Sequence, residues 1–281
     1  MNILITGCNG QLGTEMRLLS AQHPAHQYFF TDVAELDILD KEAVNTFVQT
    51  YHIDLIVNCA AYTNVDKAET DEPFALKLNA DAVANLGATG CRIIHISTDY
   101  VFSGKGYIPC REDDPVAPQT AYGRTKHAGE QALLKVCPEA IIIRTAWLYS
   151  AYGNNFVKTM LRLGKEREVL RVVYDQVGTP TYAGDLAVAI YAAIEAPEWH
   201  AGIYHFTDEG VCSWYDFTVE ILRQAGVPCR VEPILSAEYP YQTPRPHYSV
   251  LDKAKIKQTF DLTIPYWTDS LTQCLKELHE L

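Results

Sequence analysis

Short apolar runs alternate with amphipathic stretches through the first half of the chain. Runs of this kind are typical of buried strands, which we expect at residues 3–6, 27–31, 55–58, 92–97 and 140–144. Between them, apolar residues recur at helical spacing and predict helices at 11–20, 41–51, 73–88 and 121–135. This alternation favours an α/β fold with a Rossmann-type, doubly wound parallel sheet. The nearly continuous apolar run at 140–144 indicates that helices cover both faces of the sheet.

The pattern loosens after Trp147 but does not stop. We expect helices at 155–165, 184–195 and 213–226, strands at 169–173 and 203–206, a Pro-rich stretch at 228–246 and two short final helices. Residues 1–150 are therefore predicted to form a dinucleotide-binding Rossmann core. Residues 151–281 are predicted to extend the sheet and to supply a small carboxy-terminal substrate-binding cap, with the segments interleaved.

Composition narrows the class of protein. The chain has 281 residues, 48% of them hydrophobic and 21% charged, as in ordinary globular proteins. A formal net charge of −12 argues against a nucleic-acid partner. The sequence has neither an apolar stretch of about 18 residues nor a basic, apolar leader, so we expect no membrane partner and a cytoplasmic location. Eight scattered cysteines without a Cys-x-x-Cys pair are expected to be reduced thiols rather than zinc ligands.

A glycine-rich turn directly follows the first predicted strand. Its Gly-x-x-Gly-x-x-Gly spacing opens the first helix, where glycine permits a tight turn and the helix N-terminus offers free N–H groups to a pyrophosphate. A bare turn without a ligand is the alternative. We expect this turn to bind the cofactor through Gly7, Gly10, Gln11, Leu12 and Gly13.

Asp32 closes the second predicted strand, about twenty residues after the glycines, where a carboxylate binds the ribose hydroxyls of NAD and repels a 2′-phosphate. No Arg or Lys follows at 33–37, so we expect NADH to be preferred over NADPH. Asp37 and Ile38 are predicted to lie beside the adenine. The middle of the cofactor is expected to contact the stretch after the third strand, Ala60, Ala61, Tyr62 and Thr63.

Tyr122 and Lys126 are four residues apart on a predicted helix and would share one face. An ammonium beside the phenol would lower the tyrosine pKa toward useful acid/base strength. Thr98, at the end of the fourth strand, would hydrogen-bond the same substrate oxygen. A Tyr-x-x-x-Lys pair alone is commonly a surface pair, but its order after a nucleotide turn favours hydride transfer. His95, inside the fourth strand, is expected to be an interior side chain rather than a base.

Five motifs together carry a family resemblance: 7–13, 58–69, 97–104, 122–126 and 245–252. Over essentially the whole chain they resemble the extended short-chain dehydrogenase/reductases and, within them, the dTDP-4-dehydrorhamnose reductases. The resemblance implies NAD(P)H-dependent reduction of the C4 ketone of dTDP-4-dehydro-β-L-rhamnose to dTDP-L-rhamnose, a sugar donor for cell-surface polysaccharide.

The resemblance also implies roles for individual residues. Tyr122 would protonate the C4 oxygen, Lys126 would hold the nicotinamide ribose, and Thr98 would anchor the carbonyl oxygen. The sugar would contact Thr98, Asp99 and Trp147, and the nucleotide portion would contact Asn154, Asn155 and Arg245.

A metal and a second subunit are also implied. Glu15 matches a position where some relatives bind Mg²⁺ between subunits, which would make the protein a homodimer. A single glutamate on a first helix is more often solvated, so both readings of Glu15 stay open here.

Four other functions are the alternatives. A different nucleotide-sugar 4-ketoreductase or a 4-epimerase would use the same Thr, Tyr and Lys. A 4,6-dehydratase would also need an acidic pair after Thr98, where this chain has only Asp99. A non-catalytic regulatory subunit, as in the methionine adenosyltransferase β-subunit, would be expected to have a damaged trio, which this chain does not.

Overall fold

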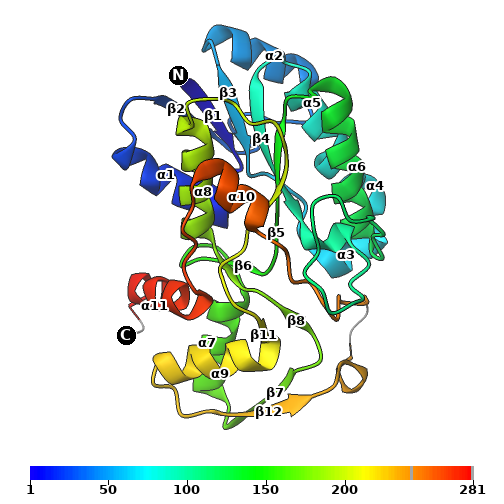
Figure 1. Ribbon diagram of the computed structural model, residues 1–281, viewed down its shortest axis with the longest axis vertical. Coiled ribbons are helices and arrows are strands. Elements are labelled where there is room, and N and C mark those ends of the chain that lie inside the picture. The colour runs from blue at the N-terminus through cyan, green and yellow to red at the C-terminus, as the bar shows by residue number, and fades with distance from the viewer. Residues whose placement is uncertain (241–242, 280–281) are drawn as a thin grey trace.

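The computed structural model describes residues 1–240 and 243–279 (Figure 1). Its centre is a six-stranded sheet in which every neighbouring pair is parallel. Across the sheet the strands run in the order β10 (Gly202–His205), β5 (Ile141–Thr145), β4 (Arg92–Thr98), β3 (Leu55–Asn58), β1 (Asn2–Thr6) and β2 (Gln27–Thr31).

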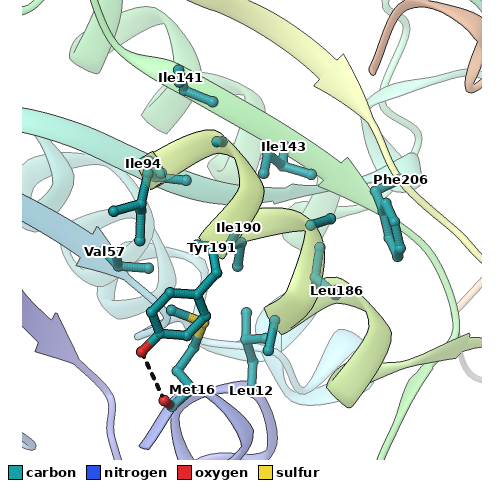
Figure 2. Close-up of a cluster of buried hydrophobic side chains, with 14 of the residues drawn as sticks. Leu12, Met16, Val57, Ile94, Ile141, Ile143, Leu186, Ile190, Tyr191 and Phe206 are labelled. Atoms are coloured by element: carbon teal, nitrogen blue, oxygen red, sulfur yellow. Dashed lines mark hydrogen bonds between the residues drawn. The ribbon is translucent and has the colours of Figure 1, made fainter. Parts of the chain in front are cut away.

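Helices cover both faces of this sheet. One face packs on α1 (Gln11–Leu19), α8 (Ala183–Glu195) and α10 (Ala254–Phe260), and the other on α2 (Lys41–Thr50), α5 (Ala82–Gly87) and α6 (Ala121–Val136). Successive strand residues face opposite sides, so Ile94 of β4 joins the first core and Ile93 the second. Figure 2 shows the first core, where the Tyr191 hydroxyl donates to the Met16 carbonyl at 3.1 Å. The expected doubly wound fold is confirmed.

A second lobe lies beside the carboxyl ends of the strands, in the lower part of Figure 1. It has its own apolar core, centred on Phe217, Leu271 and Trp267. Its helices are α7 (Phe156–Glu166), α9 (Trp214–Gln224) and α11 (Trp267–Glu277). Three small strand pairs complete it: β7 (Val169–Val173) with β12 (Arg230–Ile234), β8 (Val177–Gly178) with β11 (Cys212–Ser213), and β6 (Leu148–Tyr149) with β9 (Thr181–Tyr182).

Besides the two-residue strands β6, β8, β9 and β11, which were not expected, three larger elements differ from the sequence-based expectation. Helix α3 (Val65–Thr70) was not expected, because its six residues are too short to show a period. The helix expected at 73–88 is divided into α4 (Glu72–Leu76), a π-helical segment (Lys77–Asp81) and α5. Strand β12 lies inside the Pro-rich stretch, and it tolerates Pro233 because it pairs with β7 alone.

The path of the chain reverses at β1. From β1 the chain moves to β2 on one side and then returns to β3 on the other, so β1 and β3 flank the topological switch point. In open α/β sheets, ligands bind in the crevice at the carboxyl ends of the strands at such a point. The glycine-rich turn after β1 and residues 59–63 after β3 both lie there.

The described part of the chain contains no helix long and apolar enough to cross a membrane. All eight cysteines are free, as expected. Three short 3₁₀ turns complete the secondary structure: η1 (Ser20–Gln22), η3 (Asp99–Val101) and η4 (Ser236–Glu238).

Candidate active site

The glycine-rich turn is packed too tightly for side chains. Gly7 has a φ of 66°, and a Cβ on it would lie 2.7 Å from the Ala60 nitrogen. A Cβ on Gly13 would collide with the Gly7 carbonyl. Gly7 therefore lets the β1–α1 turn meet the segment after β3 at the switch point, and Gly13 lets α1 pack against the turn itself.

The amino end of α1 has no side-chain cap, and the Gly10 backbone before it is extended. Helix N-termini of this kind present free N–H groups and a positive dipole to an anion. Gly10, Gln11 and Leu12 line a cavity of about 540 Å³. The turn thus fits the pyrophosphate of a dinucleotide cofactor.

The same cavity brings together most of the predicted site. Its lining contains the carboxyl end of β4, one face of α6 and the segment after β5. The predicted residues that line it are Gly10, Gln11, Leu12, Ala61, Thr63, Thr98, Asp99, Tyr122, Lys126, Trp147 and Asn154.

Helix α6 is held close to the end of β4 at its first turn. Thr120 is the N-cap and its Oγ1 accepts from the Gly123 N–H at 3.0 Å, while Glu69 of α3 accepts from the Ala121 N–H at 2.7 Å. A Cβ on Gly123 would collide with the Tyr100 carbonyl. The glycine after Tyr122 therefore allows the close approach that brings Tyr122 to Thr98.

Tyr122, Thr98 and Asp99 form a hydrogen-bonded group at this contact. The Thr98 hydroxyl interacts with the Tyr122 phenol and donates to Asp99 Oδ1 at 2.9 Å. Burial raises the pKa of Tyr122 to about 12, although the Thr98 hydrogen bond opposes this. Burial also raises the pKa of Asp99 to about 7. At neutral pH Tyr122 therefore holds its proton.

Lys126 does not act on Tyr122 as the spacing predicted. Its Nζ donates to the Ile96 carbonyl at 2.7 Å and lies 3.3 Å from His95 Nε2. Burial lowers the pKa of Lys126 to about 8. The expectation that an adjacent ammonium lowers the tyrosine pKa is therefore wrong for this state, because burial dominates both groups. His95 is fully buried and bonded through both ring nitrogens, as expected of an interior side chain.

Several predicted cofactor residues are not part of the lining of this cavity. Asp32 anchors the turn, because its Oδ2 accepts from the Asn9 N–H at 3.1 Å. Asp37 is exposed and accepts from the Leu39 N–H, whereas Ile38 is buried in the α2 core. Gly7 and Gly13 shape the turn from within. Ala60 and Tyr62 precede lining residues but are not part of the lining themselves.

Asn155 and Arg245 differ from the other predicted substrate residues. The Asn155 side chain caps α7 by accepting from the Lys158 N–H, and its Nδ2 donates to Gln11 Oε1 at 3.0 Å. This amide is thus used within the protein. Arg245 donates to Asp66 of α3 at 2.7 Å and lines a neighbouring cavity of about 570 Å³.

The two cavities share an aromatic wall. Trp147 has a φ of 48° and stacks on Trp214, with ring centroids 3.5 Å apart and planes 9° from parallel. Both rings line both cavities, as does Tyr100. A ligand with a sugar in the first cavity and a charged, aromatic portion in the second would contact this wall along its length.

Sequence reasoning missed Asn79 and Trp214. Asn79 is buried in the π-helical segment, accepts from the Tyr62 N–H at 2.8 Å and donates to the Tyr62 carbonyl, which holds the loop after β3. The sequence did contain a signal for Asn79, because it is a polar residue on the apolar face of the helix expected at 73–88. Trp214 lies 67 positions after Trp147, and nothing local links the two rings.

The metal expected at Glu15, between subunits, stays a prediction. Within residues 1–240 and 243–279 of one chain, no group of three or more potential metal-binding side chains occurs. The Glu15 carboxylate accepts from the Ser150 hydroxyl, and burial raises its pKa to about 7.

Known proteins resemble this chain over nearly its full length. The family model described as RmlD substrate binding domain matches residues 1–280. A dTDP-4-dehydrorhamnose reductase of Aggregatibacter actinomycetemcomitans is 40% identical, covering 96% of each chain. A probable dTDP-4,6-dihydroxy-2-methyloxan-3-one 4-ketoreductase of Streptomyces antibioticus is 41% identical, covering 99% of this chain and 96% of the relative.

Solved structures of relatives are similar to this structure over nearly the whole chain. A dTDP-4-dehydrorhamnose reductase of Clostridium acetobutylicum has a TM-score of 0.95 at 44% identity, covering 99% of this chain and all of that one. That of Bacillus anthracis, in complex with NADP, has a TM-score of 0.94 at 38% identity, covering 98% and 99%. The uncapped turn, the Thr98–Tyr122 contact and these full-length matches place the chain in the RmlD substrate-binding-domain family, among the dTDP-4-dehydrorhamnose reductases.

Proposed function

We propose that this protein is an oxidoreductase that reduces the C4 ketone of dTDP-4-dehydro-β-L-rhamnose to dTDP-L-rhamnose. The observation that carries the proposal is the contact between the Thr98 and Tyr122 hydroxyls, in a cavity that begins at the uncapped amino end of α1. A bound NADH or NADPH would supply the hydride. Family membership supports the substrate class.

The residues of the chain supply binding and the proton. The turn at 7–13 and Lys126 hold the dinucleotide, and Thr98 binds the C4 oxygen once its hydroxyl turns from Asp99. Tyr122 then donates its phenolic proton to that oxygen as the C–H bond forms. Tyr122 is protonated at neutral pH and so has the proton to give. An ammonium turned toward the phenol would lower its raised pKa toward useful acid strength.

The sugar nucleotide would extend from one cavity into the other. Asp99, Trp147 and Asn154 lie at the sugar end, and Arg245 in the second cavity offers a guanidinium to the diphosphate. Asn155 would act indirectly, by holding Gln11 of the turn.

For the coenzyme we propose a preference for NADH. The Asp32 carboxylate accepts from the Asn9 N–H of the turn. There it would contact the adenine ribose, and its charge would repel a 2′-phosphate. The NADP complex of the Bacillus anthracis relative shows that a family member binds NADP. Comparing kcat/KM for the two coenzymes tests the preference, and a higher value with NADPH would reverse it.

Mg²⁺ at Glu15 stays a prediction, because the hydrogen bond from the Ser150 hydroxyl to one oxygen of its carboxylate is compatible with metal binding. The homodimer stays a prediction, and sedimentation with and without EDTA would test it together with the metal. The cytoplasmic location also stays a prediction.

A different 4-ketosugar is the second candidate substrate. The Streptomyces antibioticus relative, named for another dTDP-ketosugar, is as similar as the rhamnose-forming relatives. Such substrates differ at a hydroxyl. The shape of the cavity beside the wall formed by Trp147 and Trp214 would select between them.

The decisive experiment mixes the purified protein with NADH and enzymatically generated dTDP-4-dehydro-β-L-rhamnose and follows NADH absorbance. We expect stoichiometric oxidation and dTDP-L-rhamnose on chromatography. Sugar interconversion without net NADH consumption would identify an epimerase. Coenzyme binding without turnover on any dTDP-4-ketosugar would favour a regulatory subunit.

A further inference from the structure

A chain of buried hydrogen bonds runs across the sheet to Lys126. The Thr6 hydroxyl donates to Asn58 Oδ1 at 2.8 Å, Asn58 Nδ2 lies 3.0 Å from His95 Nδ1, and His95 Nε2 lies 3.3 Å from Lys126 Nζ. All four side chains are at most 1% exposed. The chain joins β1, β3, β4 and α6.

The orientation of the Asn58 amide follows from its partners. Its Oδ1 accepts from the Thr6 hydroxyl and also from the Ala60 backbone N–H at 3.1 Å. A backbone N–H can only donate, so the Asn58 oxygen must face it. The Nδ2 of Asn58 therefore faces His95 and donates to it.

This donor determines the protonation of His95. Because Asn58 Nδ2 donates to Nδ1, that nitrogen carries no proton, and a neutral ring then carries its proton on Nε2. Burial and the neighbouring Lys126 lower the pKa of His95 well below its usual value, which keeps the ring neutral. The Nε2–H consequently points at Lys126.

An N–H pointing at Lys126 distinguishes the two states of the amine. A neutral amine has a lone pair that can accept from Nε2–H, whereas an ammonium has only donors. The Ile96 carbonyl accepts from Nζ in either state. We call the place of Nζ between His95 Nε2 and the Ile96 carbonyl the docked position. It is complementary to the neutral amine only.

Other charged groups do not cancel this selection. Glu130, one turn further along α6, favours the ammonium. However, both of its oxygens are held by Arg144, at 2.8 and 2.7 Å, with Ser97 and His127 as further partners.

We propose that His95, in a tautomer fixed by Asn58, positions Lys126 by holding the neutral amine in the docked position and rejecting the ammonium. Protonation then turns the side chain toward Tyr122, with which it shares the cavity, and toward the place that the cofactor would occupy. His95 is thus a positioning residue. Its role in catalysis rests on the proposed reductase function, whereas its hold on Lys126 does not.

Two spectroscopic measurements test the proposal without turnover. The first is ¹⁵N NMR of histidine-labelled protein, assigned with His95→Asn, between pH 6 and 9. We expect His95 to carry its proton on Nε2 throughout. A proton on Nδ1 would overturn the proposal, because the ring would then accept from the ammonium.

The second is the titration of Lys126, followed in protein with ¹³C- and ¹⁵N-labelled lysine and assigned with Lys126→Met. His95→Asn keeps an acceptor near Asn58 but removes Nε2–H. We expect it to raise the Lys126 pKa from near 8 by on the order of one unit, tenfold in the protonation equilibrium. An unchanged Lys126 pKa would refute the role of His95.

His205→Asn is the matched control. His205 is also a fully buried strand histidine with a lowered pKa, but its Nδ1 faces the Cys110 carbonyl in a different part of the sheet. It should leave the Lys126 titration unchanged, and an equal shift in this control would mean that loosening any buried histidine is enough. If His95→Asn does not fold, the His95 signals are assigned with His95→Gln instead, and the tautomer measured on the unaltered protein still decides the question. Failure of the ketosugar assay with the NMR results as expected would remove only the proposed function.

Discussion

Lys126 and Glu130 lie one turn apart on α6, both are 1% exposed, and both face side chains of β4. Glu130 is fully paired: although burial alone would raise its pKa, hydrogen bonds from Arg144, His127 and Ser97 hold it at about 2. Among the described residues, Lys126 has only the Ile96 carbonyl and the neutral His95 ring as partners for Nζ, and burial lowers its pKa to about 8. A buried charge that is completely paired serves the fold, whereas an incompletely paired one is available for chemistry.

The comparison divides α6 into a catalytic half, with Tyr122 and Lys126, and a structural half, with Glu130. The largest expected effect comes from a substitution in the catalytic half. Tyr122→Phe removes the proton donor and little else, so turnover should fall by about 10²–10⁴-fold, the usual contribution of a general acid. NADH binding and Tm should change little. The assay is NADH oxidation with the ketosugar, and a near-normal kcat would exclude Tyr122 as the donor.

A substitution in the structural half should have the opposite effect, lowering stability rather than turnover. Arg144→Met leaves Glu130 buried without its cation, which costs about 3–5 kcal/mol when one partner of a buried pair is removed. Urea denaturation should show this loss of unfolding free energy, while the KM of the remaining folded protein stays close to that of the parent. A cost below 1 kcal/mol would mean that water replaces the pair.

Two glycines of α6 sharpen the comparison with matched substitutions. A Cβ on Gly123 would collide with the Tyr100 carbonyl, and one on Gly129 with the Asn79 carbonyl. Overpacking of this kind costs about 1–3 kcal/mol, so both alanine variants should lower Tm. Only Gly123→Ala should also lower kcat strongly, because it separates Tyr122 from Thr98. Equal kcat values in the two variants would contradict this division of α6.

The smallest effect is confined to acid. The pKa of Glu130 is lower in the folded protein than its ordinary value of 4.5, so its stabilising contribution is complete above pH 4.5 and is lost as the pH falls toward 2. Unfolding free energy measured between pH 6 and 3 should fall less steeply in Glu130→Gln, which starts from lower stability. Parallel curves would show that other carboxylates dominate acid unfolding.

Local patterns predicted the sheet and the turn. Strands β1 to β5 and helices α1, α2 and α6 show their periods within about ten residues. The glycine spacing at 7, 10 and 13 is also local, and it indicates a turn packed closely against its neighbours. The interruption at 77–81 was not predictable from period alone, because it depends on Asn79 packing beneath Gly129 of α6.

The site was predictable where sequence order carries it and not where burial does. Tyr122, Lys126 and Thr98 come together as expected because two neighbouring elements hold them. The protonation of Tyr122 and Lys126 was mispredicted, since a helical spacing says nothing about how much water reaches either group. The pairing of Arg245 with Asp66, 179 positions apart, has no local signature at all.

Strand β10 completes the sheet from far along the chain. It pairs with β5 only after the chain has built much of the second lobe, and α8, which precedes it, supplies Leu186, Ile190 and Tyr191 to the core beneath β1 and β3. During synthesis the edge of β5 therefore stays unpaired until β10 is made, more than fifty positions later, and this face of the sheet stays uncovered until α8 is made. A cut near residue 150 would remove 13 of the 22 buried residues of the first core, so we do not expect the part of the chain that carries the catalytic trio to fold as a detachable module.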